Sequence, residues 1–369
     1  MLYGIYLHIP FCERKCPYCD FYSLPADDAL RNRYVQALIH QIESFPRVDA
    51  DTVYFGGGTP SLLTAAQIAD IMAALHRCHT VAPDAEVSME CNPASATKQK
   101  LAAFRAAGIN RLSLGCQSFQ PQTLAALGRL HSAEEAMQTV YDAREAGFAN
   151  ISVDLMLGVP HQTPALARAD AEAALSLGVD HISAYLLKIA EGTPFAKGVE
   201  GLPDEDTQAE CYAAFCETIR AAGYRHYEIS NFARPGFESR HNLKYWRCGK
   251  WLGLGPAAHM SDGTARYSAR PDISRFLAAY ADGPLPDPMA LLQKEGDVDA
   301  EEYIIMALRT DEGLSQKTLA ERFGTAFSAA QLQFLRRCET EGFLQLQDDR
   351  VRLTPEGWLL SNAILTELI

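Results

Sequence analysis

The sequence predicts an α/β fold: an incomplete, TIM-like (βα)6 barrel followed by a mainly helical, winged-helix-like C-terminal domain. Three observations predict it. Strand-like runs alternate with amphipathic helical segments up to residue 187, this alternation yields six units where a full barrel has eight, and the end of the chain is largely helical. Such alternation indicates a parallel sheet with its ligands at the carboxyl ends of the strands. An open doubly wound sheet is the second choice.

The individual elements follow from hydrophobic periodicity and from helix-ending glycines. The predicted strands are the short runs at 4–8, 52–56, 85–90, 111–115, 151–157 and 181–187. The predicted helices are the amphipathic stretches at 29–45, 64–76, 97–107, 133–146 and 164–177. Gly108 and Gly147 follow two of these helices, at the position where glycine commonly ends a helix.

A second region begins at about Asn231, where the pattern becomes irregular and rich in Gly, aromatic and basic residues until about Pro288. The remainder predicts three helices, a short hairpin and a closing helix, which is the order of a winged helix. Its presumed recognition helix offers few cations, chiefly Arg336 and Arg337, so we expect it to pack within the protein and not on DNA. The predicted parts are the barrel at 1–230, a connecting region at 231–290 and the winged-helix-like domain at 291–369.

Composition and charge narrow the class of protein. The chain has 369 residues, an apolar fraction of 48% and a formal net charge of -13. These values predict a globular protein with one large and one smaller domain, and the acidic balance disfavours nucleic-acid partners, which require clustered Lys and Arg. We expect a cytoplasmic location, because the sequence contains neither a long uncharged apolar stretch nor a cleavable leader.

Three of the ten cysteines form a compact motif. Cys12, Cys16 and Cys19 have C-x3-C-x2-C spacing directly after the first predicted strand, on the loop where a barrel holds its active site. Three thiolates can bind three irons of a 4Fe-4S cluster and leave the fourth open to a small molecule. A zinc site is the alternative, but no second ligand pair follows. Most of the seven scattered cysteines are expected to be small core residues.

The cysteine spacing and its surroundings, YLHIPFCERKCPYCDF at 6–21, resemble the radical SAM superfamily. Within it, the chain is similar to the branch that contains oxygen-independent coproporphyrinogen III oxidase and the haem chaperones of the HemW family. The resemblance covers essentially the whole chain. It implies a radical SAM barrel with a 4Fe-4S cluster, whose open iron chelates the amino and carboxylate groups of S-adenosylmethionine (SAM). An electron from the reduced cluster can then cleave SAM to a 5'-deoxyadenosyl radical.

The resemblance also assigns the SAM contacts. Gly57, Gly58 and Thr59 in GGGTP match the element whose backbone receives the methionyl amino group, although GGGTP alone would more often be a simple tight turn. Glu90 in MECNP matches a carboxylate that binds the ribose, and Arg129 is suited to the methionyl carboxylate. The other residues that match family positions around SAM are Tyr6, which is equally explained as a strand aromatic, Gln117 and Asp154.

Two features favour the haem chaperones within this branch. The oxidases carry a further cysteine two residues after the third cluster ligand and a long N-terminal extension, whereas here that position is Phe21 and eleven residues precede Cys12. Coproporphyrinogen III dehydrogenase activity is therefore disfavoured, and whether the chain is an enzyme stays open. The segment 227–259 resembles the HemW family strongly, including the HNxxYW motif at 241–246.

The resemblance implies a protein that binds haem and transfers it to haem-dependent proteins. Histidine is a common axial ligand of haem iron, so His241 is the predicted haem ligand, with Cys248 and His259 as alternatives. A purely structural role for the motif, fixing a loop over the barrel mouth, is about equally compatible with the sequence. The chain departs from the family pattern at Met260, where the resemblance implies glycine.

Three hypotheses follow for the function. The leading hypothesis is a haem chaperone whose partners are haem and acceptor haem proteins such as respiratory enzymes, with a homodimer left open. Such a protein is expected in the cytoplasm and would reach a membrane through its partners. The alternative is a radical SAM oxidoreductase that acts on a tetrapyrrole such as coproporphyrinogen III. A regulator that binds DNA through the C-terminal module is the least favoured, because of the acidic charge.

Overall fold

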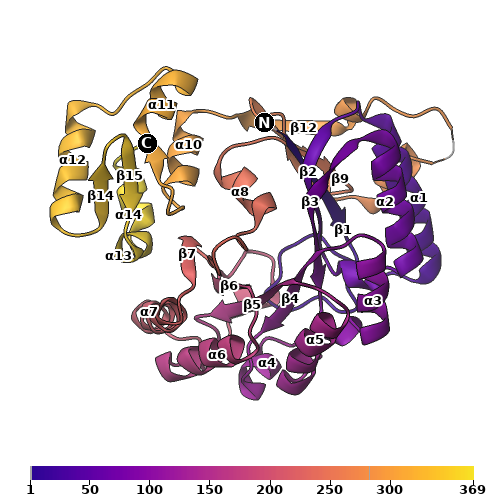
Figure 1. The fold of residues 1–369 in the computed structure, drawn as a ribbon, viewed down its shortest axis with the longest axis horizontal. Coiled ribbons are helices and arrows are strands. Elements are labelled where there is room, and N and C mark those ends of the chain that lie inside the picture. Colours follow the sequence, from indigo (N-terminus) through magenta and orange to yellow (C-terminus); the bar gives the residue numbers. More distant parts are fainter. Residues whose placement is uncertain (1, 282) are drawn as a thin grey trace.

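The computed structural model describes residues 2–281 and 283–369 and contains one large, strongly curved sheet (Figure 1). Its twelve strands have the order β12-β11-β10-β9-β1-β2-β3-β4-β5-β6-β8-β7. The six central strands are all parallel: β1 (Tyr3–Ile9), β2 (Asp49–Gly57), β3 (Thr80–Cys91), β4 (Arg111–Gln117), β5 (Asn150–Leu157) and β6 (His181–Leu186). Because the two end strands do not pair with each other, the barrel is incomplete, and the predicted partial (βα)6 architecture is confirmed.

Helices connect these strands and cover the outer face of the sheet (Figure 1). They are α1 (Asp28–Ser44), α2 (Ala65–Cys78), α3 (Lys98–Ala106), α4 (Pro121–Ala126), α5 (Ala133–Glu145), α6 (Pro164–Ser176) and α7 (Glu205–Ala221). Capping boxes at Thr64 and Ser132 start α2 and α5. The ends of the six predicted strands and five predicted helices differ from these bounds by five residues or fewer, whereas α4 and α7 were not predicted.

Side chains alternate between the two faces of the parallel strands, and this alternation defines both the core and the barrel interior. On β1, Ile5, Leu7 and Ile9 have no exposed surface and pack toward the helices. On β4, Leu112 and Leu114 are likewise enclosed by the helices, while the intervening side chains face the interior of the barrel. The side chains that face the helices stabilise the fold, and those that face the barrel interior are free to form a site.

The stretch from Asn231 to Pro288 is not irregular, so that prediction is wrong. It contains β8 (Asn231–Ala233), α8 (Arg240–Trp246), β9 (Trp251–Leu254), β10 (His259–Ser261), β11 (Ala265–Ala269) and α9 (Ile273–Ala279). With β7 (Arg225–Glu228), β8 extends the sheet antiparallel beyond β6, while β9 pairs parallel with β1 and leads to β10, β11 and β12 (Leu292–Asp297). The strands β7 to β10 have three or four residues each, too few to produce a clear period of two in the sequence.

The C-terminal domain has its own core. Its elements are α10 (Ala300–Ala307), β13 (Leu314–Ser315), α11 (Gln316–Phe323), α12 (Ala329–Thr340), β14 (Leu344–Gln347), β15 (Arg350–Leu353), α13 (Pro355–Leu359) and α14 (Ser361–Thr366). The strands form an antiparallel sheet in the order β13-β15-β14. Buried side chains between Tyr303 and Leu368 pack together, and Cys248 joins them from the loop after α8. The mainly helical C-terminal domain is confirmed, and the division at 230 and 290 stays a prediction.

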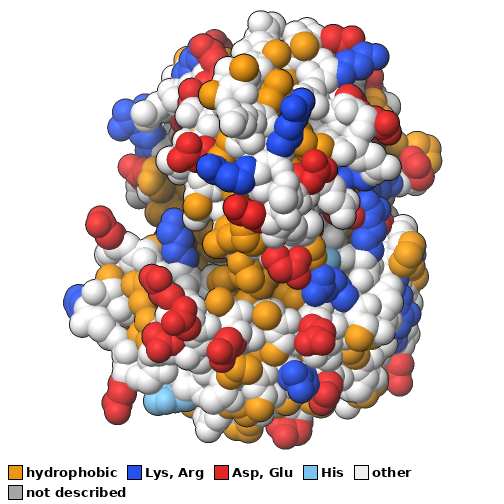
Figure 2. Space-filling view, turned by 90° about the vertical axis from the view of Figure 1, so that its left-hand side faces the viewer, with side chains coloured by type: hydrophobic (Ala, Val, Ile, Leu, Met, Phe, Trp, Pro, Cys, Tyr) orange, Lys and Arg blue, Asp and Glu red, His pale blue; other side chains and the backbone are white. Residues whose placement is uncertain are grey.

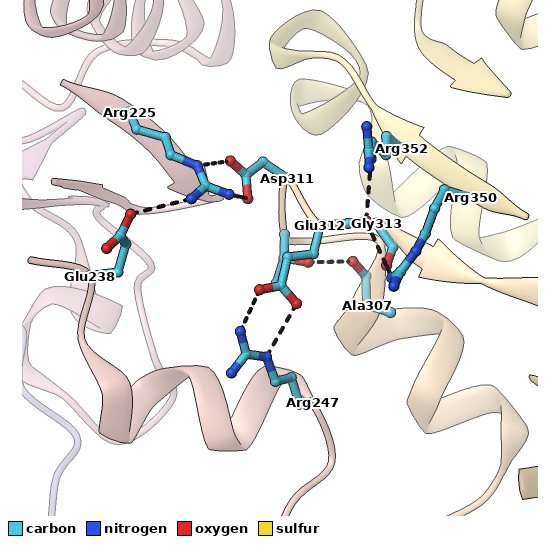
Figure 3. Close-up of polar contacts among 10 residues, drawn as sticks. Arg225, Glu238, Arg247, Ala307, Asp311, Glu312, Gly313, Arg350 and Arg352 are labelled. Carbon is cyan, nitrogen blue, oxygen red and sulfur yellow. Dashed lines mark hydrogen bonds and ion pairs between the residues drawn. The ribbon is translucent and has the colours of Figure 1, made fainter. Parts of the chain in front are cut away.

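The protein has two lobes, the barrel and the C-terminal domain. They meet through a short loop that follows α10 (Figure 3). Arg225 of β7 forms an ion pair with Asp311, and Arg247, which ends α8, forms one with Glu312. Backbone carbonyls at the same loop accept hydrogen bonds from Arg350 of the C-terminal sheet. This loop, residues 310–313, therefore contacts both lobes, and we call it the lobe clamp.

A side view shows a hollow between the C-terminal domain above and the barrel helices below, with hydrophobic side chains on its floor and charged residues around it (Figure 2). Among the described residues, no helix has both the length and the apolar composition needed to cross a membrane.

Candidate functional site

A cavity of about 460 Å³ lies in the interior of the barrel. The carboxyl ends of the parallel strands converge on it, as expected for a barrel. Ten of the twelve predicted site residues line its wall: Cys12, Cys16, Cys19, Gly57, Gly58, Thr59, Glu90, Gln117, Arg129 and Asp154. The structure therefore brings together residues that are up to 142 positions apart in the chain.

The loop after β1 carries the three cysteines along one side of this cavity. Its path is fixed by backbone hydrogen bonds, in which Cys12 N–H donates to the Leu24 carbonyl and Cys19 N–H donates to the Cys16 carbonyl, both at 3.1 Å. All three thiols are half-buried, and burial raises the pKa of Cys19. In the described part of the chain, no three His, Cys, Asp or Glu side chains are grouped closely enough to share a single metal ion.

The chemistry of this loop suits a 4Fe-4S cluster. Three thiolates facing one cavity are a soft ligand set, of the kind that holds iron–sulfur clusters, and they leave one iron for a small molecule. Arg129 lies against the loop, with Nη1 3.5 Å from the Cys16 sulfur. Cys12, Cys16 and Cys19 would hold the cluster.

The glycine turn after β2 fits directly beneath the cysteine loop. Gly57 has φ +109°, and a Cβ atom there would lie 2.6 Å from the ring of His8; a Cβ atom on Gly58 would lie 2.6 Å from the Phe11 carbonyl oxygen. The N–H groups of Gly58 and Thr59 donate to Ile9 and Phe11, at 2.9 and 2.7 Å. Since these amides hold the loop, the carbonyls are the polar backbone groups that remain for an amino group.

Glu90, at the end of β3, is held in place by two donors. The hydroxyl of Tyr54 donates to Oε1 at 2.9 Å, and the backbone N–H of Gly57 donates to Oε2 at 3.1 Å. Burial, followed by the nearby charge of Asp154, raises the pKa of Glu90 to about 7. The carboxyl is thus fixed beside the glycine turn, in a position suited to accept hydrogen bonds from hydroxyl groups.

Asp154 and Arg129 complete the polar wall. Both carboxylate oxygens of Asp154 accept from the Ser113 hydroxyl, at 2.9 and 3.1 Å, and burial raises the pKa of Asp154. Arg129 Nη2 donates to the Gly115 carbonyl at 2.8 Å. Burial opposes the charge on Arg129, but Tyr18 and Cys16 outweigh it, so its pKa is raised. A protonated guanidinium beside the cluster loop is suited to bind a carboxylate.

Tyr6 and His241 are the two predicted site residues that do not line the cavity. The Tyr6 hydroxyl is 3.0 Å from His8 Nδ1, and its ring stacks with Tyr54. His241 has no exposed surface; its Nδ1 is 2.8 Å from Thr52 Oγ1 and its Nε2 is 2.7 Å from the Tyr245 hydroxyl. Both imidazole nitrogens are engaged, so in this conformation neither is free to bind haem iron.

The geometry gives His241 a supporting position. Its ring stacks on Tyr54 with centroids 5.2 Å apart, and Tyr54 in turn donates to Glu90, so the HNxxYW helix supports the cavity wall. Of the alternatives, Cys248 is buried in the C-terminal core, and His259 is exposed with Nδ1 3.1 Å from Glu295. Only His259 presents an imidazole to solvent among these three.

Several lining residues were not predicted. Arg111 and Ser113 on β4, Ser183 and Tyr185 on β6, and Asn242 on α8 all line the cavity. A cation at the start of an otherwise largely apolar strand, as in RLSLG, is a signal that could have identified Arg111. Asn242 lies in the HNxxYW motif, but only the placement of α8 against the barrel shows that it faces the cavity.

The fold and the site together define a radical SAM protein. Residues 6–174 match the model of the radical SAM superfamily, and residues 296–360 match the model of the HemN C-terminal domain. The whole chain is 36% identical to the heme chaperone HemW of Mycobacterium tuberculosis, covering 95% of that protein. It is 35% identical to HemW of Bacillus subtilis, with 97% of each chain covered. The chain belongs to the HemW family.

The solved structure of coproporphyrinogen III oxidase (HemN) from Escherichia coli has the same fold. It superposes with a TM-score of 0.82 over 99% of this chain and 90% of that one, at 22% sequence identity. At this level of identity the similarity establishes the architecture and not the reaction.

Proposed function

We propose that this chain binds haem and transfers it to haem-dependent proteins, and that it carries a SAM-binding 4Fe-4S cluster on Cys12, Cys16 and Cys19. The observation that carries the proposal is the full-length similarity to proteins named heme chaperone, in a chain whose cavity gathers the cysteines and the SAM contacts. Phe21 supports this choice within the branch, because the oxidases would have a further cysteine at that position.

The wall of the cavity offers aromatic and basic side chains for a flat macrocycle with acidic substituents. Phe21 is 64% exposed and Tyr185 is 42% exposed, and both line the cavity together with Lys15 and Lys188. Exposed aromatic rings favour contact with a planar apolar ligand, and ammonium groups favour its propionates. These four residues support haem binding in this cavity.

The residues of the chain would bind and orient SAM. When bound, the cluster and SAM supply one-electron reductive chemistry. Glu90 would accept hydrogen bonds from ribose hydroxyls, the carbonyls of the Gly57–Gly58 turn would receive the amino group, and Arg129 would pair with the carboxylate. Asp154 and Gln117 would complete the polar wall around the nucleoside.

Respiratory haem enzymes are the acceptors that we propose. We place the protein in the cytoplasm, with any contact to a membrane made through the acceptor, and a homodimer is the assembly to test. These proposals follow from the haem-transfer role and from the acidic charge of the chain, which does not favour anionic surfaces.

An anaerobic haem titration tests the proposed function. Cluster-loaded protein is titrated with haem while Soret absorbance is followed, and apo-acceptor is then added to measure transfer. Phe21→Ala should weaken haem binding several-fold through lost aromatic contact, whereas Tyr141→Ala, an aromatic that is 50% exposed on α5, should not. The absence of a haem-dependent spectral change in the unmodified protein would refute haem binding. Coproporphyrinogen-dependent formation of 5'-deoxyadenosine would favour the oxidoreductase instead.

A further inference from the structure

A buried guanidinium faces the barrel cavity with no hydrogen bond from its Nε among the described residues. Arg111, the first residue of β4, is 2% exposed, yet it lines the cavity. Its Nε has no hydrogen-bond partner, and no ion pair joins its guanidinium to a carboxylate of the described residues. An arginine removed from water without such partners is costly to the fold. The cost is recovered if the group binds a ligand.

The direction of the side chain follows from strand alternation. Arg111, Ser113, Gly115 and Gln117 all line the cavity, whereas the residues between them are packed toward the helices. Arg111 and Gln117 are the two ends of β4, and the register of the strand shifts between Leu114 and Gln117. Arg111 is therefore at the inner end of the cavity, and Gln117 is at the end near the cysteine loop.

The helix α8 covers this inner end and adds a second polar group. Its N-terminus is fixed by Glu86, which accepts from the backbone N–H groups of Arg240 and His241 at 3.1 and 3.0 Å. In the next position, Asn242 lines the cavity, and none of its observed hydrogen bonds uses the side-chain amide. An amide donor and a guanidinium thus reach the same cavity from α8 and β4.

The charged groups around Arg111 leave its guanidinium able to bind an anion. Burial acts against the charge on Arg111, but Glu86 and then Tyr54 outweigh it, so its pKa is raised and it stays protonated. Glu86 is already engaged by the N-terminus of α8. Asp154 shares the cavity and also attracts Arg111, and its carboxylate accepts from the Ser113 hydroxyl. The guanidinium retains donors in a fork, and this geometry matches a carboxylate.

We propose that Arg111 and Asn242 form a subsite at the inner end of the barrel cavity that binds the carboxylate of a second ligand, next to SAM. The carboxylate of SAM itself is expected at Arg129, which touches Cys16 beside the cluster loop. The second carboxylate has two possible sources, a propionate of haem or a separate small carboxylic acid. The first source rests on the proposed haem binding, and the second does not.

The test uses full-length, cluster-loaded protein with saturating SAM and [1-13C]propionate as the probe. Saturable propionate binding is measured by NMR at constant ionic strength, with chloride as the reference anion. Arg111→Met, which preserves most of the volume, should weaken binding at least tenfold, and Arg111→Lys should weaken it less. Arg105→Met, on the outer helix α3, should have no effect. Cluster absorbance and circular dichroism show whether each variant is folded.

Competition experiments distinguish the two possible sources of the bound carboxylate. Displacement of propionate by haem, but not by haem dimethyl ester, supports a haem propionate as the natural occupant, and displacement by neither supports a separate small acid. Failure of haem to bind at all would count against the proposed function while the propionate result still decides the subsite. Equal propionate affinity in the unmodified protein and in folded Arg111→Met overturns the subsite. If Arg111→Met does not fold, unchanged affinity in Asn242→Ala overturns it.

Discussion

At the scale of single residues, the carboxyl of Glu90 should make SAM binding depend on pH. With a pKa of about 7, its ionised fraction rises about tenfold between pH 6 and pH 8. Because an ionised carboxylate is the better acceptor for ribose hydroxyls, we predict about tenfold tighter SAM binding at pH 8 than at pH 6. Glu90→Gln should bind SAM more weakly and without this pH dependence. Anaerobic equilibrium dialysis measures both affinities.

Glu90 should also make the stability of the fold depend on pH, but here a rise in pH is unfavourable. The pKa of Glu90 is raised from 4.5 to about 7 on folding, so the folded protein retains a proton that the unfolded chain has lost. The contribution of Glu90 to the free energy of unfolding therefore falls as pH rises from about 4.5 to about 7, and Glu90→Gln should remove this dependence. Glu217→Gln on the exposed face of α7 is the control.

For SAM binding, a pH profile of the affinity that is identical in Glu90→Gln and in the unmodified protein would contradict the assignment of Glu90 as a SAM contact.

The sequence predicts the site residues unevenly, for a physical reason. Cys12, Thr59 and Glu90 follow from motifs at strand ends, and the carboxyl ends of a parallel sheet lie along one edge. Arg111 sits at the opposite end of its strand, and Asn242 comes from a helix whose docking cannot be derived from periodicity. Their shared cavity depends on tertiary packing and is visible only in the structure.

At the scale of elements, the HNxxYW helix α8 is held against β2 by His241. Its imidazole is within hydrogen-bond distance of Thr52 and Tyr245 and stacks on Tyr54. We predict that His241→Ala lowers the free energy of unfolding by about 3 kcal/mol, because it creates a cavity and leaves polar groups unpaired. Denaturant unfolding measures this loss.

Control variants distinguish a supporting role of His241 from ligation of haem iron. Thr52→Val removes one hydrogen bond of His241 and should cost about 1 to 2 kcal/mol, whereas His259→Ala, at an exposed position, should cost little. If His241→Ala left stability unchanged but altered the Soret spectrum of bound haem, the supporting role would be wrong and iron ligation would be favoured.

Elements were predictable where their patterns are long. The parallel strands β1 to β6 are six to twelve residues long and alternate with clear amphipathic helices, so their order and type were correct. The short strands β8, β9 and β10 have three or four residues each; β8 pairs with β6 and β9 with β1, at the two ends of the parallel set, and β10 pairs with β9. Tertiary pairing, which local sequence does not encode, produced these elements.

At the scale of the whole molecule, the lobe clamp joins the barrel to the C-terminal domain. Its ion pairs are drawn in Figure 3. They are partly exposed, since the side chains of Arg225 and Arg247 are each 48% accessible. We predict that a double-mutant cycle of Arg225→Ala and Asp311→Ala gives a coupling energy of about 0.5 to 1 kcal/mol. Denaturant unfolding at low and high salt measures it, and the coupling should shrink as salt screens the pair.

The C-terminal core should not depend on this pair alone, because Cys248 and the residues between Tyr303 and Leu368 form a separate apolar cluster. A coupling energy above about 2 kcal/mol, or one that salt does not reduce, would mean that the clamp dominates the contact between the lobes. The matched control is Lys317→Ala with Glu321→Ala, an exposed pair within α11.

The assignment of Cys12, Cys16 and Cys19 as the ligands of a 4Fe-4S cluster is tested most directly by iron and sulfide analysis with EPR after anaerobic reconstitution. We predict about four irons and four sulfides per chain in the unmodified protein and in Cys78→Ala, whose thiol is also half-buried but lies at the end of α2. Cys12→Ala should lose most of this iron together with the EPR signal of the reduced cluster. A full complement of cluster iron in Cys12→Ala would contradict the assignment.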